Sequence, residues 1–394
     1  MTQALWGGSM GKCLTGALAA LLWLIATAAG AEVPGVTAGR ILFGQSAALS
    51  GPTADLGNEM RRGILAAFEE VNRAGGVGGR RLELRSYDDR YEPEIAIANT
   101  RRLIDDDHVF ALIGEVGTTT SAASEPLARA AGVPFIAPFS GAEFLRDPAL
   151  AHVVNVRASY FEETEAMVER LTGDLGITRI GVLYQDDSYG RDGLAGVRRA
   201  LDRRGLELAG TGTYMRNTTA VKTALLGLER GSPDAIIVIG AYRPSAVFTR
   251  WARKLGIRAR IFNISFVGSD ALAAALGRDG EGVYITQVVP FPESGSLPLM
   301  AEYRKALVAN DVTARPSFVS LEGYIAGRLT AGVLARAGDV PTRESFLSAL
   351  TDTGTFDIGG FKLSYGPGDN RGSDQVFLTV IHNGDIYSAE RLAP

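Results

Sequence analysis

Two short loops contain the residues of this chain that are best suited to binding an anion. The first loop follows Gly-Glu-Val-Gly and holds four consecutive hydroxyl residues, from Thr118 to Ser121, directly before a helical pattern. The second holds Ser140 and Gly141 at the matching place after the next apolar run. The first N–H groups of a helix have no partner inside the helix, and the helix dipole adds partial positive charge there. These features predict a site for a carboxylate or another small anion.

The competing interpretation is that one of these hydroxyl groups only caps its helix. For a single hydroxyl cluster, capping is the commoner role. The second loop, with Ser140 in the matching position, brings the two interpretations close to even. The residues alone leave both open.

The surrounding elements explain why the two loops should meet. Val109–Ile113 and Val133–Ala137 are apolar runs of strand length, and the pattern from Ala122 to Ala131 between them is helical. Loops that follow consecutive parallel strands leave the sheet at its carboxyl edge, which is where open α/β sheets bind ligands.

Strand and helix patterns alternate in the same way from Ile41 to Leu350, and a Gly-rich tail over residues 355–386 adds short strands. Such alternation implies an α/β fold with doubly wound parallel sheets and right-handed crossovers. One predicted helix, 318–337, carries an apolar core stripe at helical spacing: Phe318, Leu321, Ile325, Leu329 and Val333.

The N-terminal segment is typical of a secretory signal peptide. Residues 1–31 hold one charged residue, Lys12, and then an apolar run that ends in Ala29-Gly30-Ala31. We expect cleavage before Glu32, with Met10 as an alternative start. Cys13, the one cysteine, falls in the discarded part, so we expect no disulfide in the mature chain.

Composition narrows the class of the mature protein. The 40 Lys and Arg residues against 44 Asp and Glu give a formal net charge of −4, which argues against nucleic acid as a partner. Residues 32–394 exceed what one hydrophobic core usually supports, so two lobes are expected. No later run reaches about 18 apolar residues, so we expect a soluble protein.

Catalytic and metal-binding patterns were not found. His108, His152 and His382 are scattered, and there is no GxSxG, GxxxxGK[ST] or HExxH motif. The acid pairs Asp88-Asp89 and Asp186-Asp187 end strands, where turn or capping roles are expected, and Asp186 or Asp187 could also reach a cleft. We therefore predict a non-enzymatic protein with no catalytic residue, no metal and no cofactor.

A set of short motifs runs along the chain: Ala48-Leu49-Ser50-Gly51-Pro52, Val71-Asn72-Arg73-Ala74-Gly75-Gly76-Val77, Tyr87-Asp88-Asp89 with Pro93, Gly132-Val133-Pro134 with Ala137-Pro138, Gln185-Asp186-Asp187-Ser188-Tyr189-Gly190, and Asn383-Gly384. Each is weak alone. In this order and spacing they resemble the periplasmic amino-acid-binding proteins of the leucine/isoleucine/valine type, the substrate-binding components of ABC importers. The resemblance covers about residues 39–387.

The resemblance implies a type I periplasmic binding protein fold, in which two Rossmann-like lobes, each a parallel sheet flanked by helices, are joined by a three-strand hinge. By this analogy lobe 1 holds residues 38–156 and 287–372, and lobe 2 holds residues 157–286 and 373–394. The resemblance also implies a periplasmic location and delivery of a small-molecule ligand to the permease subunits of an ABC importer. We expect a monomer.

The resemblance also assigns site residues. The loops matching Thr118–Thr119 and Ser140–Gly141 would hold the ligand carboxylate. Tyr189 would close over it from the other lobe, and Tyr242 would lie near a further contact.

This chain departs from the family pattern at three places. The family often has an aromatic residue where Leu56 stands and a threonine where Gly141 stands. It also has a glutamate near Ser265–Phe266 that pairs with the ligand ammonium, whereas here the next acid is Asp270, an expected helix cap. A desolvated ammonium without a partner costs several kcal/mol, so a plain branched-chain amino acid is a poor candidate.

An apolar or aromatic wall is the alternative at this end of the ligand. Phe266, Tyr160, Phe161 and Phe139 are its candidates. The competing interpretation is that these side chains only fill the hydrophobic core. The core role is favoured for Phe161, whereas the two roles are about equally supported for Phe266.

Two functions remain open at this point. The first is a binding protein that delivers a small carboxylate-bearing ligand, an amino acid, amide, or aromatic or aliphatic acid, to an ABC importer. The alternative is a ligand-sensing protein that passes its signal to a membrane receptor, with the same fold and cleft.

Overall fold

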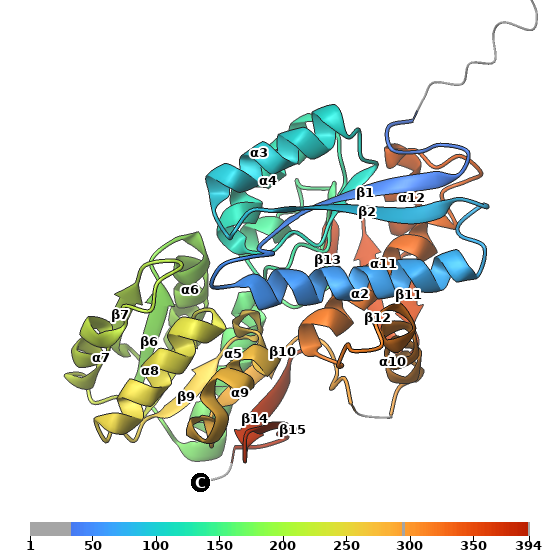
Figure 1. Cartoon of the computed structure of the whole chain (residues 1–394). Helices are drawn as coiled ribbons and strands as arrows, with labels where there is room; N and C mark the ends of the chain where they lie inside the picture. Colours follow the sequence, from blue (N-terminus) through green and yellow to red (C-terminus); the bar gives the residue numbers. More distant parts are fainter. Residues whose placement is uncertain (1–32, 294–295, 393–394) are drawn as a thin grey trace, which may run out of the picture.

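The computed structural model describes residues 33–293 and 296–392. Figure 1 shows two α/β lobes side by side, with the chain passing between them more than once. The predicted signal peptide, its cleavage site before Glu32 and Cys13 lie outside the described residues. Within those residues, no helix is long and apolar enough to cross a membrane.

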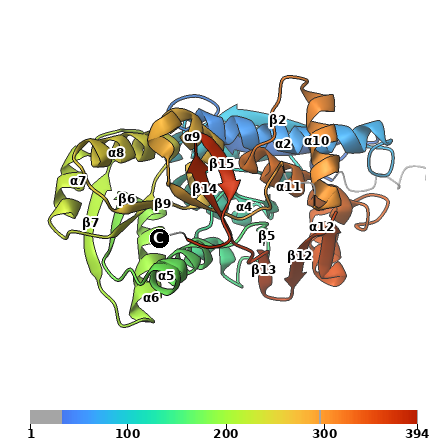
Figure 2. The same cartoon turned by 90° about the horizontal axis from the view of Figure 1, so that it is seen from below.

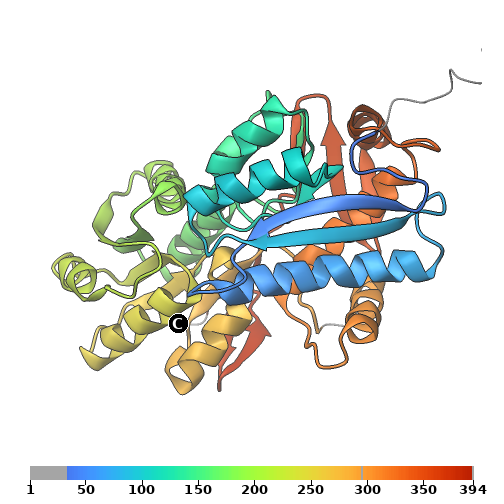
Figure 3. The ribbon, with the colours of Figure 1, turned by 45° about the horizontal axis from the view of Figure 1, so that its top comes forward.

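The first lobe is built on a five-stranded, wholly parallel sheet in the order β2-β1-β3-β4-β5. Its strands are β1 (Arg40–Ala47), β2 (Arg81–Asp88), β3 (Ala111–Ile113), β4 (Phe135–Ile136) and β5 (Val153–Val154). Its helices are α2 (Ala54–Arg73), α3 (Pro93–Arg101), a π turn (Arg102–Asp106), α4 (Thr118–Ala130) and a 3₁₀ turn (Glu143–Arg146). Figure 3 shows β1 and β2 running alongside α2.

The second lobe has a seven-stranded sheet in the order β15-β14-β10-β9-β8-β6-β7. Its strands are β6 (Ile180–Gln185), β7 (Leu208–Tyr214), β8 (Ala235–Ile239), β9 (Arg260–Asn263), β10 (Tyr284–Gln287), β14 (Phe377–His382) and β15 (Asp385–Ser388). Its helices are α5 (Tyr160–Leu175), α6 (Ser188–Asp202), α7 (Lys222–Glu229), α8 (Tyr242–Lys254) and α9 (Ser269–Leu276), with 3₁₀ turns at Ser265–Val267 and Gly277–Gly280. Because β14 and β15 pair antiparallel, this sheet is mixed and not purely parallel as expected.

The segment between β10 and β14 returns to the first lobe. It contains α10 (Pro298–Asn310), α11 (Phe318–Leu334), α12 (Arg343–Thr353) and a three-stranded antiparallel sheet of β11 (Thr355–Ile358), β12 (Phe361–Gly366) and β13 (Asp369–Gly372). Figure 2 shows β12 and β13 beside α12, away from α7 and α8.

The chain therefore passes between the two lobes three times, after β5, after β10 and after β13. The first and third crossings touch, because the Asn155 N–H donates to the Asn370 carbonyl at 2.9 Å. On this topology we propose that lobe 1 holds residues 38–156 and 287–372 and that lobe 2 holds residues 157–286 and 373–394.

The two predicted anion-binding loops do meet. Strands β3 and β4 are parallel neighbours, and a further bridge between Val116 and Phe139 extends their pairing into the loops. One detail differs from the sequence-based expectation. Helix α4 begins at Thr118, so the four hydroxyl residues form its first turn and not the loop before it.

Helices α2 and α11 pack closely because glycines line their contact. A Cβ atom built at Gly63 would lie 1.9 Å from the Ser320 carbonyl oxygen, and one at Gly323 would lie 2.3 Å from the Met60 carbonyl oxygen. The predicted core stripe of α11 is confirmed, since its five apolar residues are all buried.

We predict that Gly63→Ala destabilises the protein by about 1–3 kcal/mol, because the added methyl group must push α11 away from α2. Gly173→Ala is the matched control: it lies exposed in α5 with nothing within 4 Å of the new Cβ, and it should stabilise by roughly 0.5–1 kcal/mol. Chemical denaturation of both variants measures the difference, and equal effects would contradict this packing.

Candidate ligand-binding site

Three hydroxyl groups from separate segments form the centre of the site. The Oγ1 atom of Thr118, at the start of α4, lies 2.7 Å from Ser140 Oγ and 3.2 Å from the hydroxyl of Tyr160, which begins α5. All three side chains are buried. Burial raises the pKa of Tyr160 to about 12, so its hydroxyl remains protonated and able to donate. Hydroxyl donors at the first turns of two helices suit a carboxylate.

The backbone at this point requires glycine. Gly117 precedes α4 with a φ of +113°, and Gly141 accepts a 2.7 Å hydrogen bond from the Tyr160 N–H. A Cβ at Gly141 would lie 2.4 Å from Tyr160 Cδ1, so a larger residue there would displace the tyrosine ring. This contact explains why glycine stands where the family pattern has threonine.

The capping interpretation of the hydroxyl cluster is wrong for α4. The residue before the helix is Gly117, and no side chain caps the helix start. Thr120 donates back to the Val116 carbonyl at 2.7 Å, whereas Thr118 Oγ1 faces the second loop.

Five aromatic rings surround this centre, and we call them the aromatic cluster: Tyr91, Phe139, Tyr160, Tyr189 and Phe266. Phe266 lies in the middle, with its ring centroid 4.6 Å from Tyr189 and 5.5 Å from Phe139. All five side chains are buried, and the Tyr189 hydroxyl makes no hydrogen bond to a described residue. The cluster contains three of the four residues predicted for an aromatic wall and lacks Phe161; contact of these rings with a ligand stays a prediction.

Phe161 and Tyr242 lie apart from the cluster. Phe161 is half-buried on the outer side of α5, where the Arg199 guanidinium lies 5.3 Å from its ring centroid. Tyr242 begins α8 and takes no part in the hydroxyl centre or the ring contacts; burial and the nearby Asp55 carboxylate raise its pKa. Leu56, which stands at an often aromatic position, is buried against Gly268.

The Asp187 carboxylate connects the two lobes beside the site. It caps α6 by accepting from the N–H groups of Tyr189 and Gly190. It also accepts from Thr119 Oγ1 at 3.0 Å across the lobe boundary and forms an ion pair with Arg216 at 3.4 Å. The capping role expected for this acid pair is found at Asp187, which also contacts the other lobe at Thr119.

Other contacts join the lobes near the same place. Glu92 of the first lobe accepts hydrogen bonds at 2.8 Å from Arg216 and from Asn217 of the second lobe. The Asp270 carboxylate accepts from the Phe318 N–H at 3.3 Å, and the N-cap of α9 is Gly268. The expectation that Asp270 caps its helix is therefore wrong.

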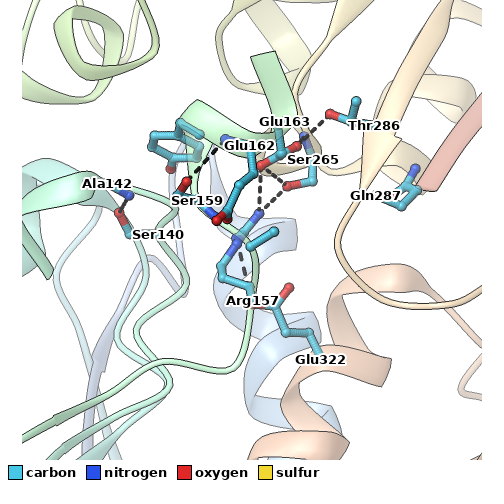
Figure 4. Close-up of polar contacts among 12 residues, drawn as sticks. Ser140, Ala142, Arg157, Ser159, Glu162, Glu163, Ser265, Thr286, Gln287 and Glu322 are labelled. Carbon is cyan, nitrogen blue, oxygen red and sulfur yellow. Dashed lines mark hydrogen bonds and ion pairs between the residues drawn. The ribbon is translucent and has the colours of Figure 1, made fainter. Parts of the chain in front are cut away.

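Sequence reasoning missed a buried charge cluster behind Ser265, shown in Figure 4. The Glu163 carboxylate accepts from Ser265 N–H at 2.7 Å, from Ser265 Oγ at 2.9 Å and from Thr286 Oγ1 at 2.5 Å. Arg157 donates to Ser265 Oγ and lies 3.6 Å from Glu163 and 3.7 Å from Glu322. No local motif signals this cluster, because its members lie up to 165 residues apart along the chain.

The histidines and remaining acids do not form a second site. His152 pairs with Glu125 at 3.2 Å, and His382 pairs with Glu281 at 2.5 Å, while Asp88 accepts backbone N–H groups in a turn. Across residues 33–293 and 296–392, no three His, Cys, Asp or Glu side chains are grouped to hold a metal ion.

Two α/β lobes joined by three crossings of the chain are the architecture of type I periplasmic binding proteins. The model of the periplasmic binding protein family matches residues 41–385, so the chain belongs to this family, and within it to the branched-chain amino-acid type. The fold and the binding-protein class implied by the motifs are thereby confirmed.

Similar proteins support this placement. Leu/Ile/Val-binding protein homolog 7 of Brucella abortus is 26% identical over 376 residues, which cover 89% of this chain and 94% of the relative. The crystal structure of a possible leucine/isoleucine/valine-binding protein from Rhodopirellula baltica SH 1 has 40% identity and a TM-score of 0.87, covering 92% of this chain and all of that one. A substrate-binding periplasmic protein from Ralstonia solanacearum has 30% identity and a TM-score of 0.82, covering 89% of this chain and all of that one.

We predict that Thr118→Ala weakens ligand binding by roughly tenfold to a hundredfold, because a hydrogen bond to a charged group contributes about 1.5–3 kcal/mol. Thr351→Ala serves as the control, since that hydroxyl donates only to carbonyls of its own helix, α12. Isothermal titration calorimetry measures both variants. An unchanged affinity in Thr118→Ala would show that the acid group binds elsewhere.

Proposed function

We propose that this protein binds a small carboxylate-bearing ligand between its lobes and delivers it to the permease subunits of an ABC importer. Family membership supports the substrate-binding role and a periplasmic or extracellular location. Export through a cleaved signal peptide, action as a monomer and the cognate permease remain parts of the proposal.

The observation that carries the proposal is the buried hydroxyl centre of Thr118, Ser140 and Tyr160, set against the aromatic cluster. The hydroxyls and helix termini suit the acid group of the ligand, and the rings suit an apolar or aromatic body. Thr119, Gly141, Tyr189, Ser265, Phe266 and Tyr242 complete the residues proposed for the site.

We propose a non-catalytic role for the same centre. Thr118 and Ser140 bond to other hydroxyl and backbone groups, and no described contact joins either side chain to a histidine, lysine or carboxylate. A hydroxyl nucleophile needs a base within hydrogen-bond reach.

The geometry also supports a ligand without a free ammonium group. The one carboxylate described at Ser265 is that of Glu163, and it already accepts three hydrogen bonds and faces Arg157. An ammonium at this end would compete with those partners, whereas an apolar group would contact Phe266 and Tyr189.

We predict that 4-methylpentanoate binds more tightly than leucine, which has the same branched body and an added ammonium. 3-Phenylpropanoate tests the aromatic case. Calorimetry of the three compounds gives the comparison directly. Leucine binding much more tightly than both acids would contradict the proposed ligand class.

A further inference from the structure

Glu163 lies where it could contact a ligand. It sits one helical turn after Tyr160 on α5, and its carboxylate holds Ser265, the residue next to Phe266 at the middle of the aromatic cluster. Its side chain is fully buried. A buried carboxylate beside a site that also binds an acid group is the feature that would recognise the ammonium of an α-amino acid.

Arg157 forms an ion pair with this carboxylate in the structure. The guanidinium is fully buried, lies 3.6 Å from Glu163 and donates to Ser265 Oγ, which itself donates to Glu163. Its Cζ atom lies 4.6 Å from the centroid of the Phe139 ring, so the cation lies against the aromatic cluster. Its Nε and Nη1 atoms make no hydrogen bond to a described residue.

The surrounding charges keep Arg157 in place. Burial alone lowers the pKa of its guanidinium, but the carboxylates of Glu322 and Glu163 outweigh this effect and raise it, so Arg157 remains charged. Burial raises the pKa of Glu322 to about 7, although Arg157 opposes this rise. Of these two carboxylates, Glu163 is the one that also holds Ser265, the residue next to Phe266.

We propose that the Arg157–Glu163 pair determines ligand class: by occupying Glu163, Arg157 prevents the site from holding an ammonium group and excludes α-amino acids in favour of plain acids. This inference rests on the proposed function. It predicts that Glu163 would hold the ammonium of an amino acid if Arg157 did not already pair with it. Arg157 acts here through Glu163 and is a positioning residue.

The test replaces Arg157 by methionine, which keeps an unbranched side chain but removes all donors. Glu322→Gln accompanies it and is the reference background, so that Glu322 is not left as an unpaired buried carboxylate. We expect Arg157→Met/Glu322→Gln to shift the ratio of leucine to 4-methylpentanoate affinity toward leucine by at least tenfold relative to Glu322→Gln alone. Adding Glu163→Gln should remove that shift. Calorimetry provides the affinities, and circular dichroism checks that each variant is folded.

Two outcomes would overturn the inference. One is an equal change in both affinities when Arg157 is replaced, and the other is a shift toward leucine that persists after Glu163→Gln is added. A loss of folding, by contrast, changes both ligands together and is detected by circular dichroism.

Glu163→Gln in the otherwise natural chain keeps the inference testable if Arg157 variants do not fold. Because Arg157 already occupies Glu163, this substitution should change leucine and 4-methylpentanoate affinity by the same factor, within about twofold. A selective loss of leucine binding would show that Glu163 holds the ammonium despite Arg157. Failure of the proposed function appears in the natural protein's own ratio, whereas failure of this inference appears in how the variants change that ratio.

Discussion

The Asp187 carboxylate is the contact on which the geometry of the site depends most. It fixes the first turn of α6, and with it Tyr189, while it accepts from Thr119 in the first turn of α4. Gln185 adds a further donor at 2.6 Å, and Arg216 supplies a positive charge. This half-buried group therefore links the lobe that carries Thr118 and Ser140 to the lobe that carries Tyr189. Separation of the lobes would break the bond to Thr119 and move Tyr160 and Tyr189 away from Thr118.

The buried guanidinium of Arg146 stabilises the loop that carries Ser140. Arg146 donates to the carbonyls of Ala142 and Arg157, each at 2.8 Å, and so ties this loop to the first crossing between the lobes. Burial lowers its pKa to about 10, which leaves the guanidinium charged at neutral pH. Backbone carbonyls and not carboxylates take its hydrogen bonds, while the nearby carboxylates of Glu143 and Glu162 act on its charge through space.

Local pattern was enough to predict most of the fold. The strands before Thr118 and Ser140 are neighbours because consecutive βα units place them so. Of the four residues predicted for an aromatic wall, Phe139, Tyr160 and Phe266 lie in the aromatic cluster and Phe161 does not. The antiparallel pairing of β14 with β10 was missed because the tail has no crossover helix to mark its direction. Arg157 and Glu163 were missed because they meet Ser265 and Glu322 only in three dimensions.

We expect ligand binding and lobe closure to be one event, because the proposed site takes groups from both lobes. Small-angle X-ray scattering with and without saturating 4-methylpentanoate tests it most directly, with Thr118→Ala at the same ligand concentration as the control. We expect a smaller radius of gyration with ligand for the natural chain and a reduced change for the variant. An unchanged radius of gyration at full saturation of the natural chain, with saturation verified by calorimetry, would contradict it.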